Sequence, residues 1–155
     1  MKKTVIIAAV LIVLTATSSF AIGIGGIFGL PVGDDLAGSN VMLSLKLDDV
    51  PFLLGIGFSA NGNNFQFGGL LDYHLTAGNL TGPIGYYAGL GGFLGLGTNL
   101  FQIGARVPLG LFFYPIEPLE LFLELSPAIG VGLGGNGVQF PIFGLQTGFG
   151  FRFWF

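Results

Sequence analysis

The stretch Leu119-Glu-Leu-Phe-Leu-Glu-Leu-Ser126 places a leucine at every second position. Successive side chains of a β-strand point to opposite faces of a sheet, so this spacing gathers the leucines on one face and Glu120, Phe122 and Glu124 on the other. An amphipathic helix would instead need apolar residues at every third and fourth position. The stretch therefore predicts a β-strand with one wholly apolar face and one mixed face.

The same two-residue alternation recurs along the chain. The other segments that show it are 41–48, 52–59, 65–75 and 149–155. Two uncharged stretches, 75–105 and 125–151, have the hydropathy of membrane-spanning helices. Glycine recurs closely within both, and each glycine costs roughly 1 kcal/mol in a helix. The sequence therefore predicts strands in these stretches as well.

The composition excludes several classes of protein. Only 8% of the 155 residues are charged, against about 25% in a typical soluble domain, so the chain lacks the polar side chains that a water-facing surface needs. High hydrophobicity excludes a disordered chain. A sequence pI near 4.7 argues against nucleic acid as a partner, because phosphates require a basic face. The low charge and high hydrophobicity therefore favour a protein in contact with lipid, and the absence of cysteine excludes a disulfide framework.

The first 21 residues are typical of a cleavable secretory signal peptide. Two lysines supply the positive charge, an apolar stretch follows at 5–14, and Ser19-Phe-Ala21 offers small residues for cleavage after Ala21. An uncleaved membrane-anchoring helix is the alternative, but the apolar stretch is short for a membrane span. We therefore expect export through the Sec pathway and a mature domain over residues 22–155.

We predict that the mature chain is all-β and closes into an eight-stranded antiparallel up-and-down transmembrane β-barrel. An open sheet in lipid would leave backbone groups unpaired at its edges, so the sheet must close. An even number of strands places both ends of the mature chain on one side, the periplasm. The predicted strands are 22–32, 39–48, 51–60, 65–75, 83–92, 100–113, 119–132 and 142–155.

Three positions fit the strand pattern less well. Gly25-Gly26 interrupts the alternation of the first strand, which predicts a β-bulge. Pro108 and Pro127 lie inside predicted strands, where each removes a hydrogen bond of the ladder. Either a bulge lies at these prolines or the two strands are shorter than predicted.

The charged residues of the predicted strands fall on the face opposite the lipid. Sliding a strand by one residue would turn its cation towards lipid and destabilise the barrel by roughly 2–4 kcal/mol near the middle of the membrane. The register predicts an ion-pair cluster of Arg106 with Glu120 and Glu124. It also predicts a looser pair of Lys46 with Asp72. The ionisable residues expected in the lumen are Lys46, Asp48, Asp72, His74, Arg106, Glu120, Glu124 and Arg152.

Two roles fit these lumen residues. The first is to hold the interior together, with His74 bonded to Asp72 and with aromatic side chains filling the space. The interior of an eight-stranded barrel is just wide enough for side chains. The second role is a path for protons or solutes. The aromatic residues expected to fill the lumen are Phe112, Tyr114 and Phe122.

The last strand carries the most specific signal in the sequence. Its alternating aromatic residues resemble the C-terminal signature that the outer-membrane barrel assembly machinery recognises. With the signal peptide and eight strands, the mature chain resembles the small outer-membrane barrels of the OmpA, OmpX and OmpW type. The stretches 106–111 and 118–127 also resemble a family of small spirochaete barrels of undefined function. The residues of the aromatic signature are Phe149, Phe151, Phe153 and Phe155.

The resemblance implies an integral protein of the bacterial outer membrane, with lipid and the assembly machinery as its partners. We expect a monomer with a structural or surface-interaction role, without a cofactor, a metal or enzymatic activity. A narrow channel for small or apolar solutes, as the OmpW type implies, is the alternative. A third hypothesis is a lipid-modifying enzyme that uses Ser44 or Ser59 with His74, the single histidine of the chain.

Overall fold

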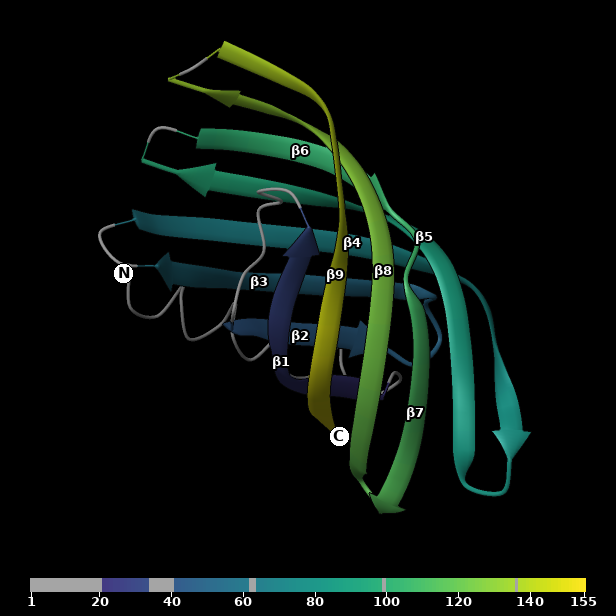
Figure 1. Ribbon diagram of the computed structural model, residues 1–155. Coiled ribbons are helices and arrows are strands. Elements are labelled where there is room, and N and C mark those ends of the chain that lie inside the picture. Colours follow the sequence, from purple (N-terminus) through teal and green to yellow (C-terminus); the bar gives the residue numbers. More distant parts are fainter. Residues whose placement is uncertain (1–20, 34–40, 62–63, 99, 136) are drawn as a thin grey trace, which may run out of the picture.

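The computed structural model consists almost entirely of β-strands (Figure 1). It describes residues 21–33, 41–61, 64–98, 100–135 and 137–155. Apart from Ala21, the predicted signal peptide lies outside these ranges. Within them, no helix is long and apolar enough to cross a membrane. The strands are β1 (Ile22–Gly33), β2 (Val41–Leu47), β3 (Phe52–Asn61), β4 (Asn64–Thr81), β5 (Ile84–Gly97), β6 (Leu100–Arg106), β7 (Leu109–Ile116), β8 (Leu119–Gly134) and β9 (Gly137–Trp154).

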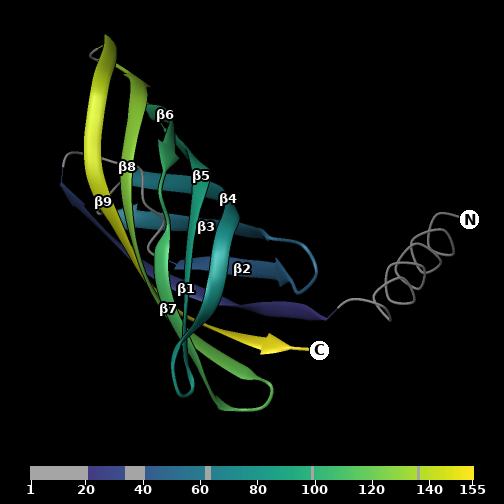
Figure 2. The same ribbon diagram turned by 90° about the vertical axis from the view of Figure 1, so that its right-hand side faces the viewer.

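The strands form one antiparallel sheet that closes on itself. The pairings run in order from β1 through β5 and from β8 to β9, and β9 returns to pair with β1. β6 and β7 share one place in this ring, because both pair with β5 on one side and with β8 on the other. The sheet therefore has eight positions, and its strands run up and down as predicted (Figures 1 and 2).

The register of the pairings fixes the stagger of the ring. Paired residues lead from Gly23 on β1 once around the sheet to Gly33 on the same strand, ten residues further along (33 − 23). With ~3.3 Å per residue and ~4.8 Å between strands, this stagger corresponds to a strand tilt of about 40°. Eight strands at this tilt leave a lumen that side chains can fill.

Pro108 causes the break between β6 and β7. The register with β8 is the same on both sides of the break, because Arg106 faces Ala128 and Leu109 faces Leu125. No residue is inserted, so the position is not a bulge. The proline nitrogen has no hydrogen to donate to the ladder, and regular pairing stops there for two residues. Neither predicted alternative describes this position, because the strand is interrupted for two residues and then continues in the same register as β7, which ends at Ile116.

Pro127 lies within β8 without interrupting it. The register with β9 runs unbroken from Ser126 to Ala128. The carbonyl oxygen of Pro127 accepts a hydrogen bond from the backbone nitrogen of Val107 at 3.0 Å. Only the reverse bond, which would need a donor on the proline nitrogen, is lost. Neither predicted alternative holds at Pro127.

The predicted bulge at Gly25-Gly26 is wrong. The register of β1 with both β2 and β9 passes through these residues without a shift. Gly26 occupies an outward position beside Phe151, whose ring would lie 3.4 Å from a Cβ atom on that glycine. Gly25 occupies the next inward position. The alternation is intact, and the two glycines conceal it because neither has a side chain to mark its face.

β4 and β5 are longer than predicted. The sequence predicts connections at 76–82 and 92–99, but β4 continues to Thr81 and β5 to Gly97. The β4–β5 ladder continues beyond His74 because register shifts at two points absorb extra residues. The glycines of both segments favoured the prediction of loops, but most residues of these segments lie in the sheet.

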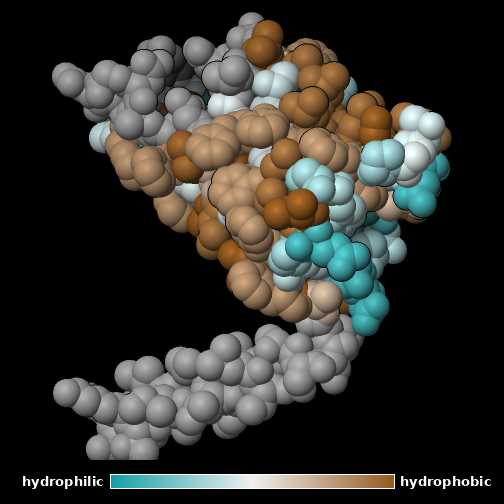
Figure 3. Space-filling model, turned by 90° about the horizontal axis from the view of Figure 1, so that it is seen from below, coloured by the Kyte–Doolittle hydropathy of each residue, from teal (hydrophilic) through white to brown (hydrophobic). Residues whose placement is uncertain are grey.

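The outer face of the sheet is apolar on every strand. Exposed leucine, isoleucine, valine and phenylalanine side chains cover it, and every charged residue in the described strands lies at an inward position. Figure 3 shows hydrophobic residues over most of the visible face and a group of hydrophilic residues at one end. The exposed charges of the described chain lie in turns, at Asp48, Asp49 and Glu117. The prediction of Asp48 as a lumen residue is therefore wrong, because β2 ends one residue before it.

Candidate functional site: the polar lumen

The lumen contains two hydrogen-bonded clusters, each built around one arginine. Both draw their members from several strands, at positions whose neighbours along the strand face outwards. The Arg106 cluster consists of Asp72, Tyr87, Arg106, Glu124, Ser126 and Gln146. The Arg152 cluster consists of Ser44, Tyr114, Glu120, Arg152 and Trp154.

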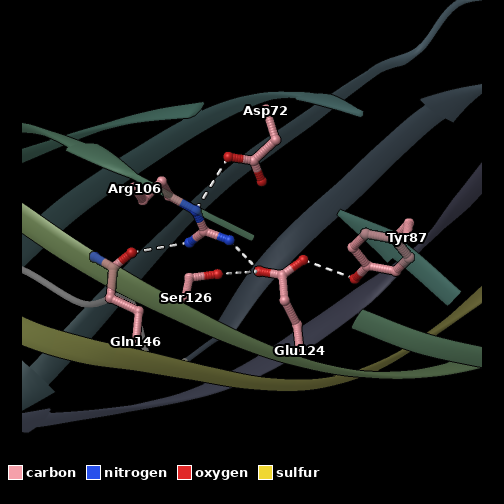
Figure 4. A network of polar contacts seen from close by, with 6 residues as sticks. All are labelled: Asp72, Tyr87, Arg106, Glu124, Ser126 and Gln146. Atoms are coloured by element: carbon pink, nitrogen blue, oxygen red, sulfur yellow. Dashed lines mark hydrogen bonds and ion pairs between the residues drawn. The ribbon is translucent and has the colours of Figure 1, made fainter. Parts of the chain in front are cut away.

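Arg106 lies between two carboxylates (Figure 4). Its Nε atom is 3.0 Å from Oδ1 of Asp72, an ion pair whose atoms lack the alignment of a hydrogen bond. Its Nη2 atom pairs with Glu124, and Nη1 donates a hydrogen bond to Oε1 of Gln146 at 2.9 Å. Both carboxylates are buried. The guanidinium therefore compensates two carboxylates that have little access to water.

Glu124 accepts further hydrogen bonds from two hydroxyl groups (Figure 4). The Tyr87 hydroxyl donates to Oε2 at 2.7 Å, and the Ser126 hydroxyl donates to Oε1 at 3.0 Å. Hydrogen bonds to an ionised acceptor are stronger than those between neutral groups. The carboxylate of Glu124 thus ties β5 and β8 to Arg106 on β6.

Arg152 is fully buried and connects three strands. It pairs with Glu120, the residue directly opposite on β8. Its Nε atom donates to the Ser44 hydroxyl on β2 at 2.8 Å. The guanidinium carbon lies 3.9 Å from the ring centroid of Phe122, a cation–π contact. The planar guanidinium uses its edge for hydrogen bonds and its face for the ring.

Lys46 lies among aromatic rings. Its Nζ atom is 6.0 Å from the ring centroid of Tyr87, 5.9 Å from that of Phe112 and 5.8 Å from that of Trp154. The indole nitrogen of Trp154 donates a hydrogen bond to Glu120 at 2.7 Å, which holds the ring in place. In the part of the chain that the structure describes, Lys46 forms no ion pair and is stabilised by the faces of these rings.

Glycine allows charged side chains two strands apart to meet. Gly91 on β5 pairs with Asp72 on β4 and with Arg106 on β6, so it lies between them. A Cβ atom on Gly91 would overlap the Asp72 carboxylate. The ion pair exists because the strand between its partners has no side chain there.

Aromatic rings fill the space next to several other inward glycines. The ring of Tyr87 covers Gly110, the residue opposite it, and the hydroxyl group reaches Glu124 on the strand beyond. Three further rings cover a glycine on the next strand in the same way. These pairs are Phe93 with Gly104, Phe112 with Gly85, and Phe122 with Gly150.

Most of the polar side chains in the two clusters are buried. A water-filled channel would leave its lining side chains exposed. Ten inward side chains instead have 2% exposure or less. They are Ser44, Leu53, Asp72, Tyr87, Gln102, Pro108, Glu120, Phe122, Ser126 and Arg152. Of the aromatic residues expected to fill the lumen, Phe122 is buried and Phe112 partly so, whereas Tyr114 is exposed at the rim.

The predicted ion pairs are only partly present. Arg106 pairs with Glu124 as predicted, but its predicted pairing with Glu120 is wrong. Glu120 lies opposite Arg152 on β9 and pairs with that residue. The predicted pair of Lys46 with Asp72 is also absent from the described residues, because Arg106 occupies the Asp72 carboxylate.

Of the residues considered for catalysis, Ser44 and His74 do not form a nucleophile–base pair. The ring of His74 stacks on Tyr87 with centroids 4.4 Å apart, and its Nε2 atom has no hydrogen-bond partner. Neither carboxylate oxygen of Asp72 has a hydrogen bond, so the predicted His74–Asp72 bond is wrong. Ser44 bonds to Arg152 instead, and the side chain of Ser59 lies outside the described residues. No group of acidic or histidine side chains within the described ranges is suited to bind a metal ion.

Several members of the two clusters are not predicted from the sequence. Tyr87, Ser126, Gln146 and Trp154 all lie at inward positions. Their positions follow from the alternation, but their contacts depend on which strands meet across the lumen. In the sequence, these members could have been identified as polar residues without charge that share a strand face with a charged residue.

The C-terminal aromatic residues lie on the outer side of β9. Phe149 and Phe153 are exposed there, Phe151 is partly exposed, and Phe155 follows the end of the strand. Phe155 remains bound to the sheet, because its backbone nitrogen donates to the carbonyl oxygen of Ile22 at 3.0 Å. Their recognition by an assembly machinery stays a prediction.

Replacing Tyr87 by phenylalanine is expected to lower the free energy of unfolding by about 1–3 kcal/mol, because the buried Glu124 carboxylate loses a donor. Thermal unfolding in detergent, followed by circular dichroism, measures the loss. Tyr86→Phe is the matched control, since Tyr86 is the adjacent residue and faces outwards. Equal losses in the two variants would show that the Tyr87 hydroxyl has no special role.

Comparison with known proteins gives one similar structure. No protein-family model and no curated protein sequence matches the chain. The chain is similar in structure to Neisserial surface protein A, with 14% sequence identity and a TM-score of 0.41 over 89% of this chain and 98% of that protein. The closed sheet is therefore inferred from the strand pairings of this chain and not from that similarity.

Proposed function

We propose that the mature chain is a monomeric integral β-barrel of the bacterial outer membrane, with a structural or surface-interaction role and a filled lumen. It reaches this location by Sec export, and the barrel assembly machinery and the surrounding lipid are its partners. It needs no cofactor and catalyses no reaction.

The observation that carries the proposal is a closed sheet whose outer face has no charge. In hydrocarbon, every backbone polar group must find a partner within the protein, which a closed ring of paired strands achieves. Exposed apolar side chains on every strand suit contact with acyl chains and not with water. The exposed charges of the described chain are confined to turns, where a membrane protein meets the aqueous phase.

The filled lumen favours a structural role over a channel. Arg106, Arg152 and Lys46 face three carboxylates in the lumen, at Asp72, Glu120 and Glu124. Equal numbers of basic and acidic side chains give the lumen no net charge that would favour cations over anions. Side chains that exclude water also leave no continuous path for a solute.

The location and the closure are tested together by fractionation and gel migration. We expect the full chain, expressed in a Gram-negative host, to appear in the outer-membrane fraction as a processed form that begins at Ile22. Unheated samples are expected to migrate differently from heated ones, because a closed barrel resists dodecyl sulfate until it is boiled. A mature protein that stays soluble in buffer without detergent contradicts the proposal.

Conductance measurements separate the filled barrel from the narrow channel. Refolded protein in a planar bilayer is expected to give no stable conductance steps, because buried side chains occupy the lumen. Reproducible steps from heat-modifiable protein, absent from a boiled sample, would favour the channel. Protein that has not folded is recognised because heating does not change its gel migration.

A further inference from the structure

The closing seam of the ring, where the last strand meets the first, contains an inward position without a side chain. Gly23 on β1 pairs with Lys46 on β2 and with Trp154 on β9. The Trp154 ring covers this glycine, since a Cβ atom there would lie 3.1 Å from the ring. The Lys46 ammonium is 5.8 Å from the centroid of the same ring. A side chain of β9 thus contacts β2 across β1.

The next inward position of the seam repeats this arrangement. Gly25 pairs with Ser44 on β2 and with Arg152 on β9. Arg152 reaches past this glycine and donates a hydrogen bond to the Ser44 hydroxyl at 2.8 Å. A Cβ atom on Gly25 would overlap the carbonyl oxygen of Phe151. Both rows thus combine a glycine on β1 with a long side chain on β9, and a side chain at Gly25 would clash with the backbone of β9.

We infer that Arg152 and Trp154 form a clasp, which links β9 to β2 over β1 and selects the register in which the ring closes. The members of the clasp are Ser44, Lys46, Arg152 and Trp154, and Gly23 and Gly25 are the gaps that it needs. This role depends on closure of the sheet alone, so it holds whatever membrane the protein occupies.

The alternation of apolar residues along β9 is compatible with more than one register against β1, so another interaction must select the observed register. A slip of one residue would turn every side chain of β9 to the opposite face. A slip of two residues preserves the faces and keeps phenylalanine on the outside. It would change the stagger of the ring by two residues and still satisfy the backbone hydrogen bonds. The hydrophobic pattern of β9 therefore does not exclude it.

The clasp opposes a two-residue slip in either direction. One slip moves Arg152 opposite Gly23, whose other partner is Lys46, so two cations would meet in the lumen. The other slip moves Arg152 opposite Ile27, whose other partner is Met42, so the guanidinium would face apolar side chains. Only the observed register gives Arg152 the Ser44 hydroxyl.

Engineered disulfides measure the register directly, because the chain has no cysteine of its own. Gly26 and Phe151 are paired outward residues, so Gly26→Cys with Phe151→Cys reports the observed register. Gly26→Cys with Phe149→Cys reports the slip that brings Arg152 opposite Gly23. Gly26→Cys with Phe153→Cys reports the opposite slip. Antiparallel partners lie at about 5.5 Å between Cα atoms, within the range that a disulfide spans.

Each cysteine pair is placed in three backgrounds, refolded in detergent, oxidised and run on non-reducing gels. In the unmodified background, we expect only the observed register. Lys46→Met keeps the Arg152–Glu120 pair and removes the opposing cation, so the 26–149 disulfide is expected to appear. Arg152→Met with Glu120→Gln removes the arginine of the clasp together with the carboxylate that pairs with it, so both slipped disulfides are expected.

Leu45→Ala is the matched control, since it removes an outward side chain from the same strand as Lys46. It is expected to give only the 26–151 disulfide. The inference is overturned if Lys46→Met gives no slipped disulfide in the heat-modifiable fraction. If the Arg152→Met protein does not fold, the Lys46→Met result decides alone, because that variant retains the buried ion pair.

Discussion

Replacing Arg106 by leucine is expected to lower the free energy of unfolding by about 3–5 kcal/mol, the largest effect of any single substitution considered for this protein. The change leaves two carboxylates without a compensating charge, and these are 0% exposed at Asp72 and 9% exposed at Glu124. Solvent therefore cannot replace the guanidinium. The temperature at which the heat-modifiable form converts to the unfolded form measures the loss.

A charge-matched variant separates lost compensation from lost packing. Arg106→Leu combined with Asp72→Asn and Glu124→Gln carries no uncompensated carboxylate, so it is expected to recover most of the lost stability. Replacement of a buried ion pair by neutral groups is often tolerated when removal of one partner is not. Unchanged stability of the single variant, or no recovery in the triple variant, would contradict the role assigned to Arg106.

Replacing Leu125 by arginine is expected to destabilise the protein in lipid by roughly 2–4 kcal/mol. Leu125 is 53% exposed and lies near the middle of β8, which spans Leu119–Gly134. An arginine there would face the hydrocarbon. Urea unfolding of the protein refolded into phosphatidylcholine vesicles, followed by tryptophan fluorescence, measures the effect.

An outward position closer to the end of β8 provides the control for Leu125→Arg. Leu133→Arg introduces the same charge on the same outer face of β8, close to the end of the strand. Near the membrane surface the expected loss is only about 0–1 kcal/mol. Equal losses at the two positions would show that the apolar face is not buried in a bilayer.

The strands themselves were predictable from local pattern. Alternation in 119–126 placed Glu120 and Glu124 on one face and the leucines on the other, and the structure has the same division. A one-face apolar pattern depends only on neighbours along the chain. Glycine conceals this signal, as at Gly25-Gly26 and in the long β5, because a residue without a side chain does not indicate a face.

The contacts inside the lumen were much less predictable. The sequence placed Arg106 on the inward face but could not show that Asp72, two strands away, would meet it across Gly91. That meeting depends on the stagger of the whole ring, to which every strand contributes. Arg152 was likewise predicted in the lumen, but its pairing with Glu120 requires the register of the last two strands.

Where a ring on the neighbouring strand covers an inward glycine, the two positions depend on each other for space. Phe122 and Gly150 share one volume in the lumen, as do Tyr87 and Gly110. A larger residue at either glycine has no space unless the ring opposite becomes smaller at the same time. We therefore expect a larger residue at either glycine to be tolerated only when the ring on the neighbouring strand is replaced by a smaller side chain in the same variant.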